Sequence, residues 1–117
     1  MKKDPYVYLL HILESIGHIE RSIANRSGEE FLKNTELQDA IIRRIQIIGE
    51  AAKLVPEDFK KVNGDIPWKK MAGMRDKVVH DYFEVDLELV WQVVTRELPA
   101  LQILVKDLLA KRPDGNV

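Results

Sequence analysis

An arginine, a histidine and a tyrosine lie close together in MAGMRDKVVHDYF, residues 71–83. Arg75, His80 and Tyr82 form the pattern Arg-x4-His-x-Tyr among apolar neighbours. Near neutral pH an imidazole can take a proton from a ribose 2′-hydroxyl or give one to a leaving oxygen. A guanidinium can hold a phosphate through paired hydrogen bonds and stabilise the charge that grows in the transition state. Since a tyrosine can orient the phosphate or stack on a base, the trio suits phosphodiester cleavage.

The spacing within this trio conflicts with a regular helix. On an ideal helix, residues five apart differ by about 140° in direction and about 7.5 Å in height, so Arg75 and His80 do not share a face. Arg75 and Tyr82, seven apart, do share one. Either the helix loosens near His80 and turns the imidazole toward the arginine, or a symmetric dimer builds one cleft from two copies of each residue. The spacing therefore predicts a distorted helix end or a two-fold interface through the site.

A second group of polar side chains, His11, Glu14 and His18, lies near the N-terminus. Positions 11 and 18 are about 20° apart on an ideal helix, so a metal site is one interpretation. Di-iron bundles use Glu-x-x-His, whereas the spacing here is Glu-x-x-x-His, without a second copy. The chain also has no cysteine to supply a thiolate. Because the ligands are too few, we expect a solvated polar face and no metal.

Glu50 follows Gly49 within the apolar stretch IIGEAAKLV. Glycine inside a helix costs up to about 1 kcal/mol relative to alanine, so it usually indicates close approach of another backbone. One interpretation is tight helix packing, with the Glu50 carboxylate at a rim or paired with Arg43, Arg44 or Arg75. The other is a carboxylate that lines the functional site.

The first element that must support these residues begins at Asp4-Pro5, an N-cap followed by proline in the first helical position. Apolar residues then recur at steps of three and four and form one stripe. The stripe consists of Leu9, Ile12, Ile16, Ile19 and Ile23. We expect this helix to fade around residues 25–27.

Two stretches with the spacing of a capping box follow, Ser27 with Glu30 and Thr35 with Gln38. They predict a short helix at 29–33 and a long helix at 36–54. The long helix carries an apolar stripe of Leu37, Ile41, Ile45, Ile48, Ala52 and Val55, widened by Ile42, Ile47, Ala51 and Leu54. Two apolar faces in so small a chain indicate a central helix or a subunit interface.

The second half of the chain is also helical in pattern. Pro56 and Asn63-Gly64 predict a loop, and Pro67 restarts a helix. That helix has Trp68, Met71, Met74, Val78 and Val79 as its apolar positions. A last helix is expected at 86–111, kinked or broken at Pro99, because an interior proline costs about 3 kcal/mol. No window alternates with period two, so we predict one domain, residues 1–117, with an all-α fold: a four-helix-type bundle with short additional helices.

The composition limits the classes of function. The chain has 117 residues with 45% hydrophobic and 32% charged side chains, which is typical of a soluble globular protein. A net charge of −1 gives no global attraction to nucleic acid or to anionic membranes. An enzyme that grips a short stretch of RNA needs only a local basic patch. We see no membrane-length apolar run and no signal-peptide pattern, so we expect a cytoplasmic protein.

With these motifs the sequence resembles the HepT-like toxins, small helical ribonucleases of the HEPN superfamily. Arg75, His80 and Tyr82 match the family signature Arg-x4-His-x-Tyr without departure. Asp76 stands where the superfamily often has Asn or Asp. The segments DAIIRRIQIIGEAAKLVP, IPWKKMAGMRDKVVHDYFEVDLELVW and ELPAL are typical of the family too. The resemblance extends over about residues 4–109.

The resemblance implies a HEPN-like bundle that acts as the toxin of a type II toxin–antitoxin pair. Such toxins are endoribonucleases without metal or cofactor, and they form homodimers with the active cleft at the interface. Their antitoxin is a nucleotidyltransferase of the MNT type. In part of the family it neutralises the toxin by AMPylation of the motif tyrosine, here Tyr82.

On this basis we assign a role to each residue of the motif. His80 is the general base or acid in attack by the 2′-hydroxyl, which leaves a 2′,3′-cyclic phosphate. Arg75 binds the scissile phosphate, Asp76 orients Arg75 or His80, and Tyr82 aids positioning. The alternative is a non-catalytic helical module that dimerises and binds a nucleotidyltransferase or a nucleotide. A third hypothesis is a structural bundle in which His80 and Tyr82 are satisfied core groups.

Overall fold

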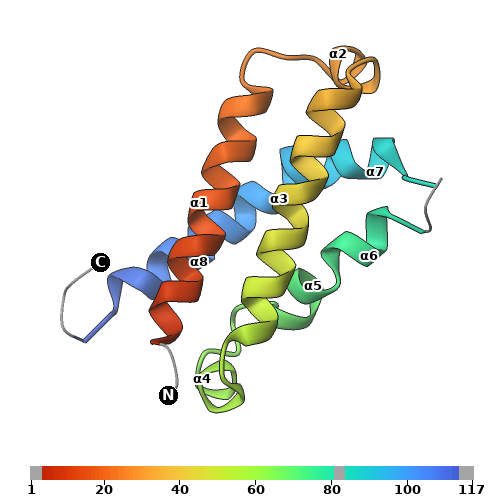
Figure 1. Cartoon of the computed structure of the whole chain (residues 1–117). Coiled ribbons are helices and arrows are strands. Elements are labelled where there is room, and N and C mark those ends of the chain that lie inside the picture. The colour runs from red at the N-terminus through yellow and green to blue at the C-terminus, as the bar shows by residue number, and fades with distance from the viewer. Residues whose placement is uncertain (1–3, 81–83, 114–117) are drawn as a thin grey trace.

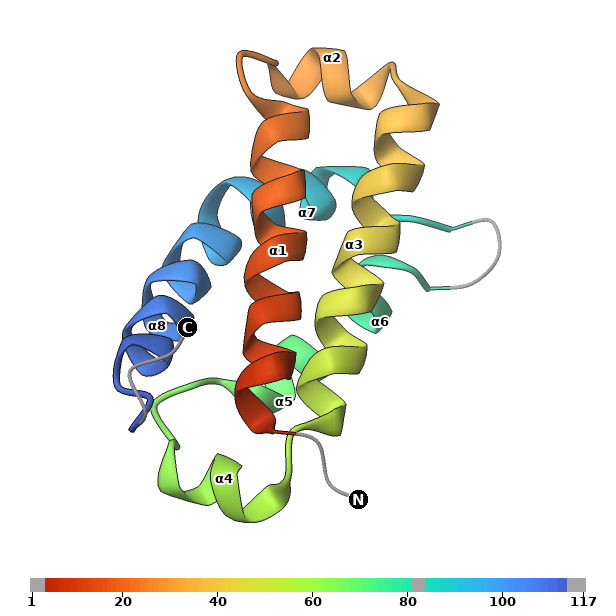
Figure 2. The same cartoon turned by 60° about the vertical axis from the view of Figure 1, so that its left-hand side comes forward.

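Two long helices form the centre of the fold. The computed structural model describes residues 4–80 and 84–113. Helices α1 (Pro5–Ile23) and α3 (Thr35–Leu54) run antiparallel, side by side (Figure 1). The short helix α2 (Gly28–Leu32) lies between them at one end of the pair, as Figure 2 shows from another side. The predicted bounds of these three helices agree with the observed bounds to within a residue at nearly every end.

The remaining helices pack around this pair. They are α4 (Glu57–Val62), α5 (Trp68–Ala72), α6 (Met74–Val78), α7 (Leu87–Gln92), the π-helix η1 (Val93–Glu97) and α8 (Leu98–Ala110). Figure 1 shows α7, η1 and α8 crossing behind α1 and α3, with α5 and α6 beside α3. The prediction of an all-α bundle with short additional helices is confirmed.

The apolar stripes of these helices meet in one core. Most positions of α1 and α3 predicted from spacing are buried: Leu9, Ile12, Ile16, Ile19, Leu37, Ile41, Ile45, Ile48 and Ala52. Ile23, the last position of the first predicted stripe, is only half-buried at the end of α1. At the α2 end, the ring of Phe31 stacks on that of Trp91 with centroids 5.3 Å apart. Within the described ranges, no helix has the length and hydrophobicity that a bilayer crossing requires.

Side-chain caps fix where the first helices begin. The Asp4 carboxylate accepts from the backbone N–H of Tyr6, and Ser27 with Glu30 forms the predicted capping box. The second predicted box, Thr35 with Gln38, is wrong. Asn34 is the N-cap of α3 instead, and its side-chain oxygen accepts from Leu37 N at 3.0 Å. Asparagine competes well for this position because its short side chain reaches the free N–H groups.

The irregularity predicted at Pro99 takes the form of a π-helical turn. Proline lacks an N–H, and its ring conflicts with the carbonyl four residues earlier, that of Thr95. The wider π-turn, η1, precedes the proline, so the chain stays helical from α7 to α8. The Thr95 hydroxyl donates to the carbonyl of Trp91 at 2.6 Å.

Two segments differ from their predictions. The helix expected from Pro67 through Val79 is divided at Gly73 into α5 and α6, and it ends at Val78. Val79 is extended and pairs with Val85 in an isolated antiparallel bridge. The expected loop after Pro56 contains α4, which packs the ring of Phe59 against that of Trp68. In both places tertiary packing, rather than apolar spacing, decides where the helix begins and ends.

Candidate functional site

Arg75 is the second residue of α6, and its side chain is 47% exposed. Its Nη1 atom donates to Oδ1 of Asp76 at 3.3 Å. Because both side chains are exposed, this ion pair adds little to stability. It restrains the guanidinium through one nitrogen, while the group carries five N–H donors in all. Arg75 is thus an exposed cation with the donor geometry for an anionic ligand.

A hollow of about 180 Å³ lies between α3 and the α5–α6 segment, beside this arginine. Its lining consists of Gln46, Gly49, Glu50, Lys53, Ala72, Arg75 and Asp76. A Cβ atom on Gly49 would lie 3.2 Å from the carbonyl oxygens of Met71 and Ala72. The glycine therefore permits the backbone of α5 to approach α3, which confirms the packing interpretation of this residue.

Glu50 lines the same hollow. Its Oε1 atom accepts from Gln46 Nε2 at 3.3 Å, one turn earlier on α3. Among the described residues, no ion pair joins Glu50 to any of the three arginines named as candidate partners. Glu50 is exposed at the surface, so its charge remains hydrated without an arginine partner. The two interpretations of this stretch are compatible, because Gly49 serves packing while Glu50 faces the hollow.

His80 lies beyond the end of α6, in extended backbone. The backbone N–H of His80 donates to the backbone carbonyl of Glu84 at 2.8 Å, and the backbone N–H of Asp86 donates to the backbone carbonyl of Val78 at 2.8 Å. These two bonds flank the Val79–Val85 bridge and fix the backbone of His80 to the end of α6. His80 is exposed, so the hypothesis that it is a core group is wrong.

Arg75 and His80, the two expected catalytic residues, lie on neighbouring segments of the chain but do not line the same hollow. Arg75 and Asp76 line the hollow beside α3, whereas His80 is not part of its lining. Since α6 ends at Val78, the 140° separation expected on a continuous helix does not apply to His80. Of the two arrangements considered from the spacing, the distorted helix end is present. The two-fold interface stays a prediction.

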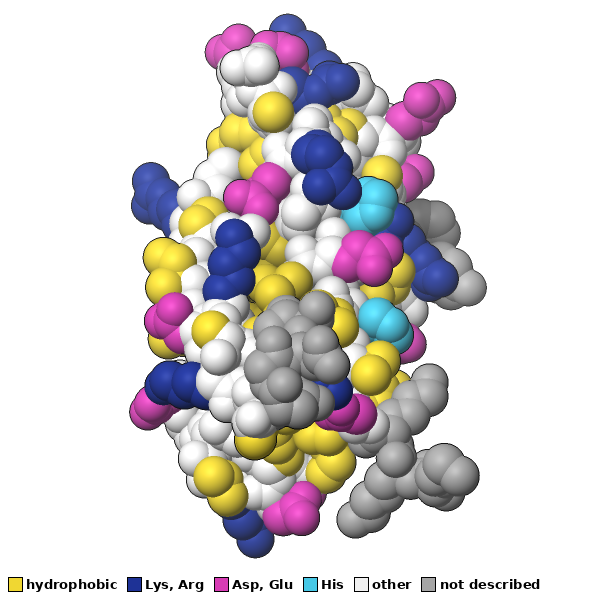
Figure 3. Space-filling model, turned by 90° about the vertical axis from the view of Figure 1, so that its left-hand side faces the viewer, with side chains coloured by type: hydrophobic (Ala, Val, Ile, Leu, Met, Phe, Trp, Pro, Cys, Tyr) yellow, Lys and Arg dark blue, Asp and Glu magenta, His cyan; other side chains and the backbone are white. Residues whose placement is uncertain are grey.

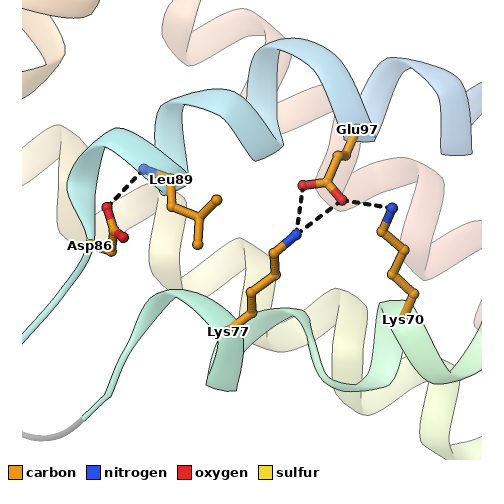
Figure 4. Close-up of polar contacts among 5 residues, drawn as sticks. All are labelled: Lys70, Lys77, Asp86, Leu89 and Glu97. Carbon is orange, nitrogen blue, oxygen red and sulfur yellow. Dashed lines mark hydrogen bonds and ion pairs between the residues drawn. The ribbon is translucent and has the colours of Figure 1, made fainter.

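Glu97 of the π-helix holds both short helices in place. Its carboxylate is bound by Lys70 Nζ of α5 at 2.9 Å and by Lys77 Nζ of α6 at 3.2 Å (Figure 4). Helices of five residues are too short to be stable alone, so such contacts matter for their position. Lys77 is two residues from Arg75, and Glu97 therefore helps fix the helix that carries the arginine.

The same ion pairs alter the acidity of Glu97. Its side chain is 21% exposed, and burial alone raises its pKa. The hydrogen bonds and charges of Lys70 and Lys77 outweigh burial, so the pKa lies below the ordinary glutamate value. The carboxylate is ionised at neutral pH and is shared by the two lysines.

The remaining predicted residues are Tyr82 and the polar group on α1. Tyr82 lies outside the described residues. On α1, Nε2 of His18 is 3.9 Å from Oε1 of Glu14, which is a loose and half-exposed contact. Within residues 4–80 and 84–113, no three His, Asp or Glu side chains lie close enough together to hold a metal ion.

Several residues around the site were missed from the sequence. Gln46 and Lys53 lie four before and three after Glu50, so helical spacing on 36–54 could have placed them on its face. Glu97 gave no such signal, because its partners are 27 and 20 positions away in the chain. Only the folded arrangement brings its carboxylate to the two lysines.

Most of the chain matches one described protein family. A family model described as Ribonuclease HepT-like matches residues 12–108. A ribonuclease-related protein of Thermococcus cleftensis, named a probable ribonuclease HepT, is 43% identical over 102 residues. That match covers 87% of this chain and 93% of the relative. A protein of Caldanaerobacter subterraneus, named provisionally as an RNase, is 39% identical over 109 residues, covering 93% and 97% of the two chains.

A longer relative carries the same region beside another activity. This protein of Methanocaldococcus jannaschii is named for gamma-glutamylcyclotransferase and, provisionally, for an RNase, and is 48% identical over 102 residues. The match covers 87% of this chain but only 46% of the relative, so this chain spans about half its length. No solved structure matches the chain significantly.

Proposed function

Because this chain belongs to the HepT-like ribonuclease family, we propose that it is a metal-independent endoribonuclease and the toxin of a type II toxin–antitoxin pair. Two relatives, both named provisionally as ribonucleases, align with most of the chain, which supports the nuclease activity. The toxin role rests on the family resemblance.

The observation that carries this proposal is the end of α6 at Val78, two residues before His80. Were the helix continuous, Arg75 and His80 would point in different directions. The chain instead leaves the helix after Val78, and both side chains are exposed at the surface. A phosphate-binding guanidinium and a proton-transfer imidazole are thus both accessible to a bound strand, whether they come from one copy of the chain or from two.

In the proposed reaction His80 transfers protons and Arg75 binds the phosphate. A neutral imidazole of His80 takes the proton of a ribose 2′-hydroxyl, and the 2′-oxygen bonds to phosphorus. The bond from phosphorus to the 5′-oxygen breaks, and this oxygen is protonated by an imidazolium or by water. The products are a 2′,3′-cyclic phosphate and a 5′-hydroxyl. Arg75 binds the phosphate oxygens, where charge accumulates, and Asp76 orients the guanidinium.

We place this chemistry in a homodimer. The hollow beside Arg75 is not lined by His80 of the same chain, so a second copy is a source of the missing imidazole. Leu54 on α3 is 62% exposed, and Ile42 and Ile47 are half-buried, which leaves apolar surface on the same helix. Burial of that surface would favour association.

The antitoxin in this proposal is an MNT-type nucleotidyltransferase that attaches AMP to Tyr82. The modification would add a bulky anionic group two residues after His80 and so oppose phosphate binding. Intact-mass measurement after co-expression with an MNT-type nucleotidyltransferase tests this step. An unmodified mass in an inhibited complex would show that Tyr82 is occluded and not modified.

The nuclease itself is tested with purified protein on RNA in the presence of EDTA. The wild type should cleave, and His80→Ala should lower the rate by about 10²- to 10⁴-fold, the usual contribution of a general acid or base. His11→Ala is the matched control, because His11 is an exposed histidine remote in sequence from the motif. Absence of cleavage by the wild type, with tight binding to the nucleotidyltransferase, would favour the non-catalytic module.

A further inference from the structure

A second hollow adjoins the hollow at Arg75. It has a volume of about 230 Å³, and its lining consists of Glu57, Lys60, Lys61, Trp68, Lys69 and Ala72. Ala72 lines both hollows, so they meet on the surface of α5. Their combined lining includes residues of α3, α4, α5 and α6.

Basic side chains gather along this surface. We call the set of Lys53, Lys60, Lys61, Lys69 and Arg75 the basic track. Three carboxylates, Glu50, Glu57 and Asp76, line the same hollows, so the surface carries an excess of positive charge in a chain of net charge −1. The face that lies at the left of Figure 1, which Figure 3 views, has basic and acidic side chains interspersed.

Most cations of the track are not neutralised by the protein. Lys53, Lys61 and Lys69 are exposed and, within the described part of the chain, form no ion pair. Lys60 and Arg75 are the exceptions, since Lys60 Nζ lies 3.5 Å from Glu57 Oε1 and Arg75 Nη1 lies 3.3 Å from Asp76 Oδ1. Lys70 and Lys77, on the same two helices as Lys69 and Arg75, are both bound to Glu97. Lys53, Lys61 and Lys69 thus combine a position beside the hollows with a charge that no carboxylate of the described residues pairs.

We propose that the basic track binds the phosphate backbone of single-stranded RNA that flanks the scissile phosphate at Arg75. This inference rests on the proposed ribonuclease function, and it assigns Lys53, Lys61 and Lys69 as substrate-binding residues. A strand held at Arg75 would pass Ala72 and place its next phosphates near Lys69 and Lys61. Lysine binds phosphate as a mobile point charge, so such contacts tolerate any base sequence.

RNA is favoured over an acidic protein segment because the track includes the arginine that binds phosphate in the proposed function, and Ala72 borders both hollows. A strand that already occupies the first hollow brings regularly spaced negative charges to the second one. An acidic protein segment has no scissile phosphate for Arg75 to bind, so its position on the track would not be fixed by that residue. Loss of nucleotidyltransferase binding without loss of RNA affinity is therefore the outcome that would assign this surface to a protein.

The test compares the double variant Lys61→Gln/Lys69→Gln with Lys106→Gln, a control on α8 whose side chain is exposed and lines neither hollow. Affinity for an RNA of about 20 nucleotides is measured by anisotropy at several salt concentrations. Each lost phosphate contact reduces the magnitude of the negative slope of log K against log salt by about 0.7 for a single strand. The slope of the double variant should therefore be shallower than that of the wild type by about 1.4. The control should keep the wild-type slope.

Cleavage kinetics give a second measure that depends on substrate length. The double variant should raise KM for the long RNA several-fold, with a much smaller effect on kcat. For a dinucleotide, which reaches only Arg75, KM should change far less. Equal slopes and equal KM values for the double variant and the control would overturn the proposal. If the wild type binds RNA with the expected slope but does not cut it, the proposed nuclease fails while the track stands.

Discussion

Glu97 is the residue at which three elements of this fold converge. It lies on the π-helix and binds one lysine from α5 and one from α6. Neither short helix has enough internal hydrogen bonds to be stable alone. The carboxylate also pairs with Lys70 and Lys77, whereas Lys53, Lys61 and Lys69 beside the hollows form no ion pair within the described residues. One acidic side chain thus affects both the position of Arg75 and the distribution of charge around it.

The lowered pKa of Glu97 predicts a pH-dependent contribution to stability. A group with a lower pKa in the folded state stabilises the fold above its unfolded pKa, and this contribution is lost as pH falls through the folded pKa. Glu97→Gln should therefore unfold more easily than the wild type at pH 7, by about 1 kcal/mol, given that both lysines are half-exposed. Urea denaturation at pH 7 and at a series of acidic pH values measures this difference.

Lys70→Met and Lys77→Met separate stability from positioning. Each removes one ion pair with Glu97, but only Lys77 is on the helix of Arg75. If the difference in unfolding free energy between Glu97→Gln and wild type stays the same well below the ordinary glutamate pKa, Glu97 does not have the lowered pKa assigned to it. Equal cleavage by the two lysine variants would show that Glu97 does not position Arg75.

At the residue scale, the sequence is informative where chemistry depends on residue type and close spacing. Arg75 and His80 could be selected because few combinations of side chains suit phosphate chemistry, whereas Asp76 was selected only through the family resemblance. Glu97 could not be selected, since exposed glutamates are common and only its tertiary contacts with two lysines distinguish it. The break before His80 was one of two predicted arrangements, because the spacing itself conflicted with a regular helix.

At the scale of elements, the contact between α3 and α5 depends on Gly49. Gly49→Ala gains up to about 1 kcal/mol of helix propensity. Its Cβ, however, would lie 3.2 Å from the Met71 and Ala72 carbonyl oxygens, which belong to backbone and cannot rotate away. Overpacking of this kind costs typically about 1–3 kcal/mol, so the variant should be less stable than the wild type. Chemical denaturation checks the sign, and RNA cleavage should fall as α5 and α6 shift.

Gly17→Ala on α1 is the matched control. The new Cβ would lie 3.2 Å from Nη1 of Arg21, the far end of a flexible side chain that can move. This variant should therefore gain stability, by up to about 1 kcal/mol, while cleavage is unchanged. If Gly49→Ala is stabilised to the same degree as Gly17→Ala, the approach of α5 to α3 is looser than the structure shows.

The elements differ in how well the sequence predicts them. The stripes of α1 and α3 are long and regular, so both helices and their buried faces could be predicted. The division at Gly73 and the end at Val78 could not, because short helices begin and end where packing and the Val79–Val85 bridge require it. Pro99 indicated an irregularity, but the choice of a π-turn over a break depends on contacts along the whole of α7 and α8.

At the scale of the whole molecule, affinity for RNA must come from arrangement and not from net charge. The net charge is −1, so long-range attraction to a polyanion is weak. The basic track brings the unpaired Lys53, Lys61 and Lys69 to the same two hollows as Arg75, whereas Lys70 and Lys77 are paired with Glu97. The nuclease is therefore expected to bind RNA weakly until a strand occupies both hollows, with strong dependence on salt.

A composite site across two copies of the chain predicts complementation between inactive variants. Arg75→Ala and His80→Ala should each be inactive as homodimers. If each site takes Arg75 from one copy and His80 from the other, a mixed dimer regains one intact site, built from the unchanged residue of each variant. With random assembly half of the dimers are mixed, so co-expression should restore about one quarter of wild-type cleavage. Differently tagged copies, purified through both tags, isolate the mixed dimer for assay. Cleavage at the level of the separate variants would show that both groups of a site come from one chain, and would confine the catalytic geometry to the end of α6.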